Sequence, residues 1–129
     1  LGRKATVALV GIGSMDTVHS SLYRGGHVPE DQVIGMRKRG AIGDVGGFNI
    51  DAEGGHVADA GSFWASGTDF GAFLGIPVRV AVTTGAHKVR QIDAALRGGL
   101  INHLITDRAT ALALFNSRKR HDDGNPGRA

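Results

Sequence analysis

The chain has 129 residues, of which 41% are hydrophobic and 21% are charged, and its formal net charge is +3. This length and balance fit one globular domain with a real core, or a large piece of one. The sequence has no Cys, which excludes disulfides and thiolate metal sites, and no apolar run approaches the roughly 20 residues of a membrane span. We therefore expect a protein that does not enter a membrane, with the cytoplasm as the default compartment.

Two further features bear on the origin of the chain and on its loops. The first residue is Leu1 rather than Met, so we expect a fragment or a processed product. Glycine is frequent, at 21 residues, whereas proline contributes only 3. Because the glycines stand between apolar runs, they indicate tight turns and close approach of the backbone to a ligand.

The first half of the chain predicts one strand, two helices and a glycine-rich segment. In chain order the elements are a strand over residues 5–10, a loop over 11–14, helices over 18–24 and 29–38, an extended segment over 41–50 and a turn over 51–55. The strand (ATVALV) is almost entirely apolar, which is typical of a strand buried on both faces. The second helix has Pro29 in its first turn and ends at Gly40.

The second half alternates helices with strands. In chain order the elements are a helix capped by Thr68 or Asp69 and ending at Leu74, a strand over 78–82, a loop over 83–87, a helix over 88–97, a strand over 100–105, and a helix capped by Thr106 or Asp107 and ending near Ser117. This alternation predicts an α/β fold with a mainly parallel, Rossmann-like sheet flanked by helices. We expect one domain over residues 1–117 and a disordered tail over 118–129; nucleic-acid binding by residues 118–120 is the weaker alternative.

Three glycine-containing segments could bind a ligand. The first is Gly11, Gly13 and Ser14, where glycines let the backbone approach an anion and the serine adds a hydroxyl. The segment lacks the third glycine of a dinucleotide fingerprint and the lysine of a P-loop, so we expect no cofactor. The alternative is a tight turn at the exit of a strand.

The second segment contains Gly43, Asp44 and Asp51, two carboxylates separated by a glycine-rich backbone. Aspartate accepts hydrogen bonds from sugar hydroxyls, and the glycines leave space for a sugar ring. The alternative is that both aspartates bond their own backbone in turns.

The third segment contains Thr84, Gly85 and Lys88, in a loop that opens a helix. Backbone N–H groups at such a place attract anions, and lysine adds a positive charge, so phosphate is the expected anion. The alternative is a solvated lysine in a first helical turn. No pair of histidines has the spacing of metal ligands, and no serine has the context of a hydrolase nucleophile, so we expect neither a metal site nor a catalytic triad.

Several segments resemble the sugar-binding domain of the SorC/DeoR family of bacterial transcription regulators. The matching segments are residues 7–14 (VALVGIGS), 40–48 (GAIGDVGGF) and 76–111, of which residues 94–107 (AALRGGLINHLITD) are the most specific. The resemblance covers roughly residues 5–115. It implies a fold similar to those of ribose-5-phosphate isomerase and glucosamine-6-phosphate deaminase, a phosphorylated sugar as effector, and a helix-turn-helix domain upstream. It also implies that about half of the sugar-binding domain lies outside this chain, on its N-terminal side.

These inferences converge on a non-catalytic sensor, in which a phosphorylated sugar binds across the three segments. Binding would shift the equilibrium of a homo-oligomer and so change the DNA affinity of a separate domain. The rival function is a sugar-phosphate isomerase or deaminase, with Asp44 or Asp51 as general base and Lys88 holding phosphate. A third alternative is a domain that only oligomerises.

Overall fold

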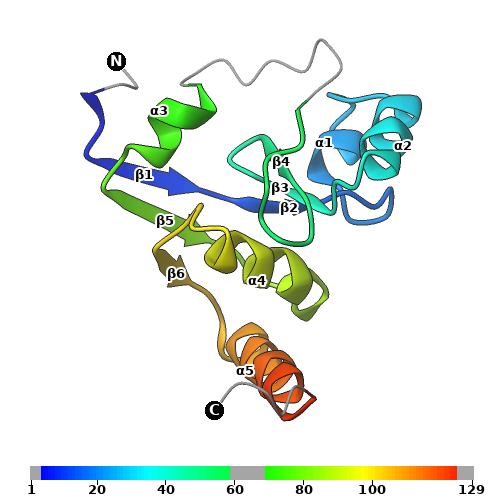
Figure 1. The fold of residues 1–129 in the computed structure, drawn as a ribbon. Coiled ribbons are helices and arrows are strands. Elements are labelled where there is room, and N and C mark those ends of the chain that lie inside the picture. Colours follow the sequence, from blue (N-terminus) through cyan, green and yellow to red (C-terminus); the bar gives the residue numbers. More distant parts are fainter. Residues whose placement is uncertain (1–3, 59–68, 125–129) are drawn as a thin grey trace.

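The structure is a computed structural model that describes residues 4–58 and 69–124. Its elements are arranged around two small sheets (Figure 1). In chain order they are β1 (Val7–Val10), β2 (Ile12–Ser14), α1 (Ser21–Arg24), α2 (Glu30–Lys38), β3 (Gly43–Val45), β4 (Phe48–Ile50), α3 (Phe70–Leu74), β5 (Val78–Val82), the 3₁₀ turn η2 (Ala86–Lys88), α4 (Val89–Arg97), β6 (His103–Ile105) and α5 (Arg108–Asp123).

The first sheet has the order β1-β5-β6, and all of its strands are parallel. Val7 pairs with Val78, and Val80 pairs with His103. The connection from β1 to β5 runs over residues 11–77, which is about half of the chain. Helix α4 connects β5 to β6. The predicted α/β fold with a parallel sheet and helices is confirmed.

The second sheet is antiparallel, with the order β2-β3-β4, and it corrects two predictions. Residues 11–14, predicted as a loop, contain β2, and the extended segment 41–50 folds back as the hairpin β3-β4. Gly46 and Gly47 form the turn with φ values of 58° and 90°. Two consecutive residues with positive φ make a two-residue hairpin turn, which is why this position requires the glycine pair.

The main core lies where α4 packs against both sheets. Ile92, Ala94 and Ala95 of α4 are fully buried. They belong to one apolar cluster with residues of the parallel sheet, the antiparallel sheet and α3, including Ala81, Val45 and Phe73. Because this helix touches β2, β3 and β4, it fixes the position of the hairpin relative to the ends of β1 and β5.

Helices α1 and α2 enclose a second, smaller apolar cluster at the other end of β2. Val33 and Met36 of α2 pack there with Met15, Val28 and Ala41. Ser20 accepts a hydrogen bond from the N–H of Tyr23 and so caps α1, which begins three residues later than the predicted Val18 start.

The other predicted caps are found where the structure describes them. Asp69 accepts from the N–H of Ala72 at 2.8 Å and Asp107 from that of Thr110 at 2.8 Å, whereas Thr68 lies outside the described residues. The strand predicted over 100–105 is shorter, since β6 begins at His103.

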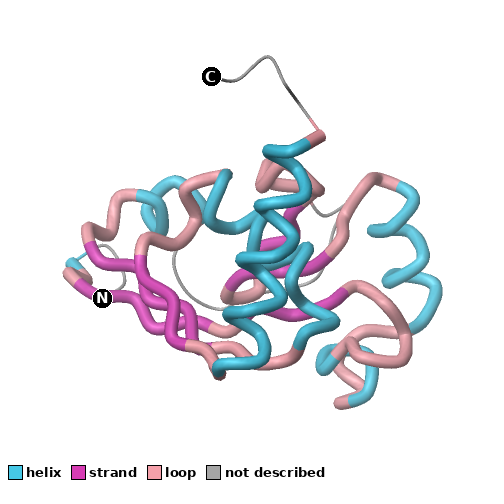
Figure 2. Tube along the Cα trace, turned by 90° about the horizontal axis from the view of Figure 1, so that it is seen from below, coloured by secondary structure: helices cyan, strands magenta, loops and turns pink. Residues whose placement is uncertain are grey.

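Helix α5 extends beyond its predicted end at Ser117. It continues to Asp123, and it lies beside α4 (Figure 2). The predicted disordered tail is therefore wrong for residues 118–123, which form the last turns of the helix, while residues 125–129 lie outside the described residues. Composition misled here because charged residues with good helix propensity can extend a helix that is already anchored.

One face of the parallel sheet is not covered by any described element. The register places Val7, Leu9, Val82 and Ile105 on this face, with 57%, 71%, 46% and 57% of their surface exposed. Parallel sheets are normally covered on both faces, so this face is unusual for the architecture. No helix in residues 4–58 or 69–124 is long and apolar enough to cross a membrane.

Candidate functional site

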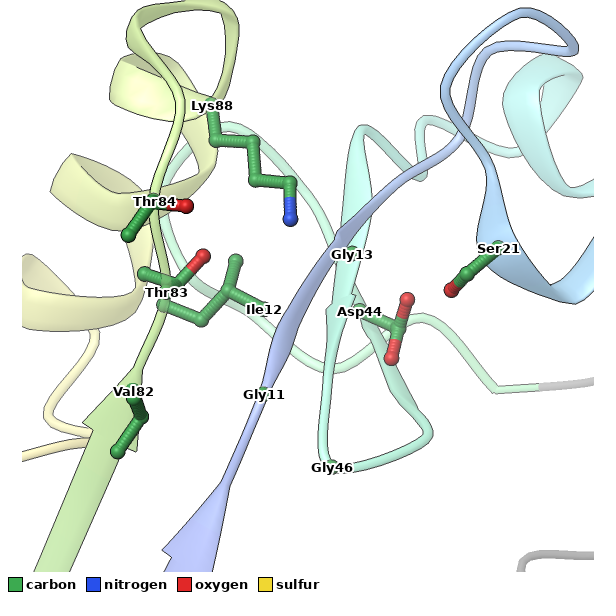
Figure 3. Close-up of a pocket in the computed structure, with 10 residues that line it drawn as sticks. All are labelled: Gly11, Ile12, Gly13, Ser21, Asp44, Gly46, Val82, Thr83, Thr84 and Lys88. Carbon is green, nitrogen blue, oxygen red and sulfur yellow. The ribbon is translucent and has the colours of Figure 1, made fainter. Parts of the chain in front are cut away.

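A cavity of about 440 Å³ opens beside the carboxyl ends of β1 and β5 (Figure 3). Ten residues line it: Gly11, Ile12, Gly13, Ser21, Asp44, Gly46, Val82, Thr83, Thr84 and Lys88. Open α/β sheets bind ligands at the carboxyl ends of their strands, which is where this cavity lies. Five of the residues predicted to bind an effector meet here, namely Gly11, Gly13, Asp44, Thr84 and Lys88.

One side of the cavity carries hydroxyl donors and a positive charge. Thr83 and Thr84 follow β5 directly, and Lys88 ends the η2 turn with its side chain extended into the cavity. Thr83 is only 5% exposed, and its Oγ1 has no hydrogen-bond partner within the described ranges. A buried hydroxyl without a partner is costly, so this wall is suited to a ligand that supplies the missing bond.

The opposite side carries Asp44, on β3. Its carboxylate accepts a hydrogen bond from the N–H of Gly47 at 3.1 Å. Burial raises the pKa of Asp44, while the Gly47 hydrogen bond and the charge of Lys88 act in the opposite direction. The hydroxyl of Ser21, at the start of α1, points toward this carboxylate across the cavity.

The loop that carries Lys88 is held in place by α5. Gly85 has a φ of 115°, and its N–H donates to Thr110 Oγ1 at 2.8 Å. The Lys88 N–H donates to the carbonyl of Gly85 at 2.9 Å, which closes the η2 turn. Because Thr110 is only 1% exposed, the loop is anchored to a buried point of the fold. Gly85 therefore positions the loop, and its N–H is already used within the protein.

Four other predicted binding residues lie outside the cavity lining. Ser14 is buried, and its hydroxyl bonds the Asp16 carboxylate and accepts from Gln91 Nε2 at 3.4 Å. Asp51 accepts from the N–H groups of Glu53 and Gly55 at 3.0 and 2.7 Å, as the turn alternative expected. Gly43 is packed against Gln91, and Gly85 holds the loop as described.

The structure also adds residues that the sequence did not single out. Ser21 reaches the cavity because the chain turns back after β2, and nothing in the local sequence marks that return. Thr83 could have been found, since it is the first residue after a predicted strand in an open α/β sheet. Gly46 belongs to the hairpin turn, which the reading of 41–50 as a single extended segment concealed.

The cavity as a whole can hold a small polar molecule with two different ends. The ammonium of Lys88 with the two threonine hydroxyls suits an anionic group, and Asp44 suits hydroxyl donors. Among the described residues, no group of three or more His, Asp or Glu side chains is placed to hold a metal ion.

Comparison with known proteins identifies the family of the chain. The family model described as "Putative sugar-binding domain" matches residues 1–116. The transcriptional regulator LsrR of Enterobacter sp. (strain 638) is 34% identical over 113 residues, which are 86% of this chain and 35% of the relative. The chain thus spans about a third of the length of this curated relative.

Solved structures of transcription regulators share the fold. The full-length sorbitol operon regulator SorC from Klebsiella pneumoniae has a TM-score of 0.73 and 28% identity, covering 88% of this chain and 36% of that one. A DeoR family transcriptional regulator from Listeria monocytogenes has a TM-score of 0.78 at 24% identity, covering 88% of this chain and 45% of that one. The second likeness is one of fold alone.

Proposed function

The chain belongs to the sugar-binding domain family of SorC/DeoR-type transcription regulators, and from this premise we propose that it senses a phosphorylated sugar. The phosphoryl group would bind Lys88, Thr83 and Thr84, and the sugar hydroxyls would bind Asp44. With such an effector, the regulator would control genes of carbohydrate metabolism.

The observation that supports this proposal is the division of charge across one cavity. Lys88 and Asp44 lie on opposite sides of it, and the buried Thr83 hydroxyl has no partner in the described part of the chain. A phosphorylated sugar has an anionic phosphoryl group, rich in hydrogen-bond acceptors, at one end and several hydroxyl donors at the other. Each end therefore matches one side of the cavity.

We propose binding without catalysis. The relatives that match the chain are transcription regulators. An isomerase or deaminase would use a general base in contact with a substrate carbon, and Asp44 is the carboxylate that lines the cavity. Purified protein incubated with sugar phosphates is expected to release no product; steady turnover that disappears in Asp44→Asn would establish the enzymatic alternative.

The rest of the proposed function concerns parts of the regulator beyond this cavity. We propose that DNA is bound through a separate helix-turn-helix domain, that the protein works in the cytoplasm as a homo-oligomer, and that sugar binding shifts the oligomer between two states. A ligand can shift such an equilibrium only by its difference in affinity for the two states.

A thermal-shift screen of sugar phosphates, each paired with its unphosphorylated sugar, tests the effector class. A ligand at a hundredfold excess over its Kd stabilises the folded state by about 2.7 kcal/mol, which is readily measured. We expect at least one phosphorylated member of a pair to stabilise the protein and its partner to have little effect. Equal stabilisation by both members would contradict a phosphoryl-binding site.

A further inference from the structure

A second cavity, of about 590 Å³, lies between α4, α5 and the turn after β4. Its lining includes Glu53 of the turn, Arg90, Asp93 and Arg97 of α4, and His121 of α5. The η2 turn separates it from the first cavity, since Ala86 and His87 line the second while Lys88 lines the first. The two cavities are therefore distinct sites on opposite sides of one turn.

One lining residue of the second cavity, Asp93, has its carboxylate held between two guanidinium groups. Asp93 Oδ2 accepts from Arg97 Nε at 2.7 Å, and Asp93 Oδ1 accepts from Arg118 Nε at 2.7 Å. The Asp93 side chain is 15% exposed, against 53% for Arg97 and 49% for Arg118. The Asp93 carboxylate is therefore more buried than the two guanidinium groups, and it holds them from the protein side.

Each of the two arginines keeps a terminal nitrogen for which the structure gives no hydrogen bond within the described ranges. Both arginines use Nε for the carboxylate, and Arg97 also donates from Nη2 to the carbonyl of Ala52 at 2.9 Å. Within the described ranges, Arg118 makes no further hydrogen bond through its terminal nitrogens. Guanidinium groups fixed in this way lose little rotamer entropy on binding an anion, because the protein has already ordered them.

Arg90 adds a third guanidinium group to the same cavity. Counting Arg118 with the lining, three guanidinium groups face two carboxylates, those of Asp93 and Glu53, so the site carries a positive excess. The imidazole rings of His87 and His121 also line this cavity. We propose that this cavity is a second binding site, for a small phosphoryl anion, separate from the sugar cavity.

Inorganic pyrophosphate is the probe that tests the proposal, titrated by calorimetry and by amide NMR at constant ionic strength. Arg90→Gln is the informative variant, since Arg90 makes no hydrogen bond or ion pair in the described part of the chain and its loss should not disturb folding. Arg37→Gln, on the exposed side of α2, is the control that removes the same charge elsewhere. Lys88→Ala is the control for the sugar cavity.

The expected result is saturable pyrophosphate binding that moves the amide signals of α4 and α5. Arg90→Gln should weaken it about tenfold, the loss of one charge-assisted hydrogen bond, while Arg37→Gln and Lys88→Ala leave it within about twofold. Equal weakening by Arg37→Gln would show that pyrophosphate responds to the net charge of the protein and not to a specific site. Loss of the pyrophosphate-induced shifts at residues 93–97 and 117–121 in Lys88→Ala, or the absence of saturable shifts there, would overturn the second site. Pyrophosphate bound at Lys88 itself would instead move the amide signals of residues 83–85, so the two cavities are read separately.

Discussion

Gly13 and Asp44 face each other across strands β2 and β3, and a methyl group on Gly13 would overlap the Asp44 carboxylate. The glycine therefore makes room for the acid in the cavity wall. In the sequence, Gly13 suggested a backbone contact with an anion. The packing gives an additional reason for glycine there, because it lets Asp44 lie against the neighbouring strand.

Gly13→Ala is accordingly expected to disturb both stability and sugar binding. Overpacking of this kind typically costs about 1–3 kcal/mol, and the carboxylate would have to leave its position by the Gly47 N–H. Gly11→Ala is the matched control for stability, since a Cβ there meets nothing within 4 Å. Urea denaturation compares the two variants, and a calorimetric titration of Gly13→Ala against the parent measures sugar binding. Equal loss of stability in both variants would contradict a specific role for the Gly13–Asp44 contact.

Asp44→Asn is expected to raise the stability of the fold at neutral pH while it abolishes sugar binding. Burial raises the pKa of Asp44 above its ordinary value of 3.8, so folding disfavours the charged form. A group of this kind lowers the free energy of unfolding as the pH rises from 3.8 through the folded-state pKa, and the loss persists at higher pH. Asparagine carries no charge and so avoids that loss of stability, and its side-chain oxygen can still accept the hydrogen bond from the Gly47 N–H.

The measurement is the free energy of unfolding as a function of pH for both proteins. The difference in favour of Asp44→Asn should be smallest in acid and should reach a plateau at neutral pH. A variant that is less stable than the parent at every pH would show that the carboxylate itself holds the hairpin together.

Gly54→Ala tests the backbone contact that positions the main core. Gly54 has a φ of 83°, and a Cβ there would lie 2.7 Å from the Cα of Gly98 at the end of α4. The left-handed conformation costs about 1–2 kcal/mol for alanine, and the overlap adds about 1–3 kcal/mol more. Gly99→Ala separates the two effects, because Gly99 has a φ of 71° with nothing within 4 Å. Thermal unfolding should rank Gly54→Ala well below Gly99→Ala; similar melting temperatures would contradict the contact.

The parallel part of the fold could be predicted from sequence because its signals are local. Residues 78–82 are apolar except for Arg79, and Gly98 follows the last residue of α4 as expected. The hairpin could not be predicted in the same way. Its strands have three residues each, too few for periodicity to be seen, and they form only because β2 pairs with β3 across a long sequence separation.

The candidate site was partly predictable for a related reason. Thr84 and Lys88 follow the strand of residues 78–82, so the rule for open α/β sheets places them at the carboxyl edge, whereas Asp44 was proposed from its glycine-rich surroundings. Asp51 looked equivalent to Asp44 in sequence, yet its carboxylate closes its own turn. Which of two nearby aspartates faces the cavity depends on the register of the hairpin. A shift of one residue in the strand pairing would move each side chain to the opposite face of the sheet.

The uncovered face of the parallel sheet predicts that the chain associates with a further copy of itself. Leu9 is 71% exposed and Val7 is 57% exposed on this face. Contiguous apolar surface of this kind is unusual on a monomer. Sedimentation velocity should detect oligomers that Leu9→Lys reduces, whereas Leu112→Lys, on the outer side of α5, serves as the control. A stable monomer without any partner would contradict this expectation.

Lys88→Ala should weaken binding of the phosphorylated sugar by roughly ten- to a hundredfold. Lys88 extends into the cavity beside Thr83 and Thr84, and a charge-assisted hydrogen bond contributes about 1.5–3 kcal/mol, at about 1.4 kcal/mol per factor of ten. The fold should change little, because the η2 turn is closed by the Lys88 backbone N–H and anchored through Gly85 and Thr110. The unphosphorylated sugar should bind both proteins alike, since it presents no anion to the ammonium group. Calorimetry with the two ligands separates the cases: an affinity for the phosphorylated sugar within twofold of the parent, or an equal loss for the plain sugar, would remove Lys88 from the phosphoryl site.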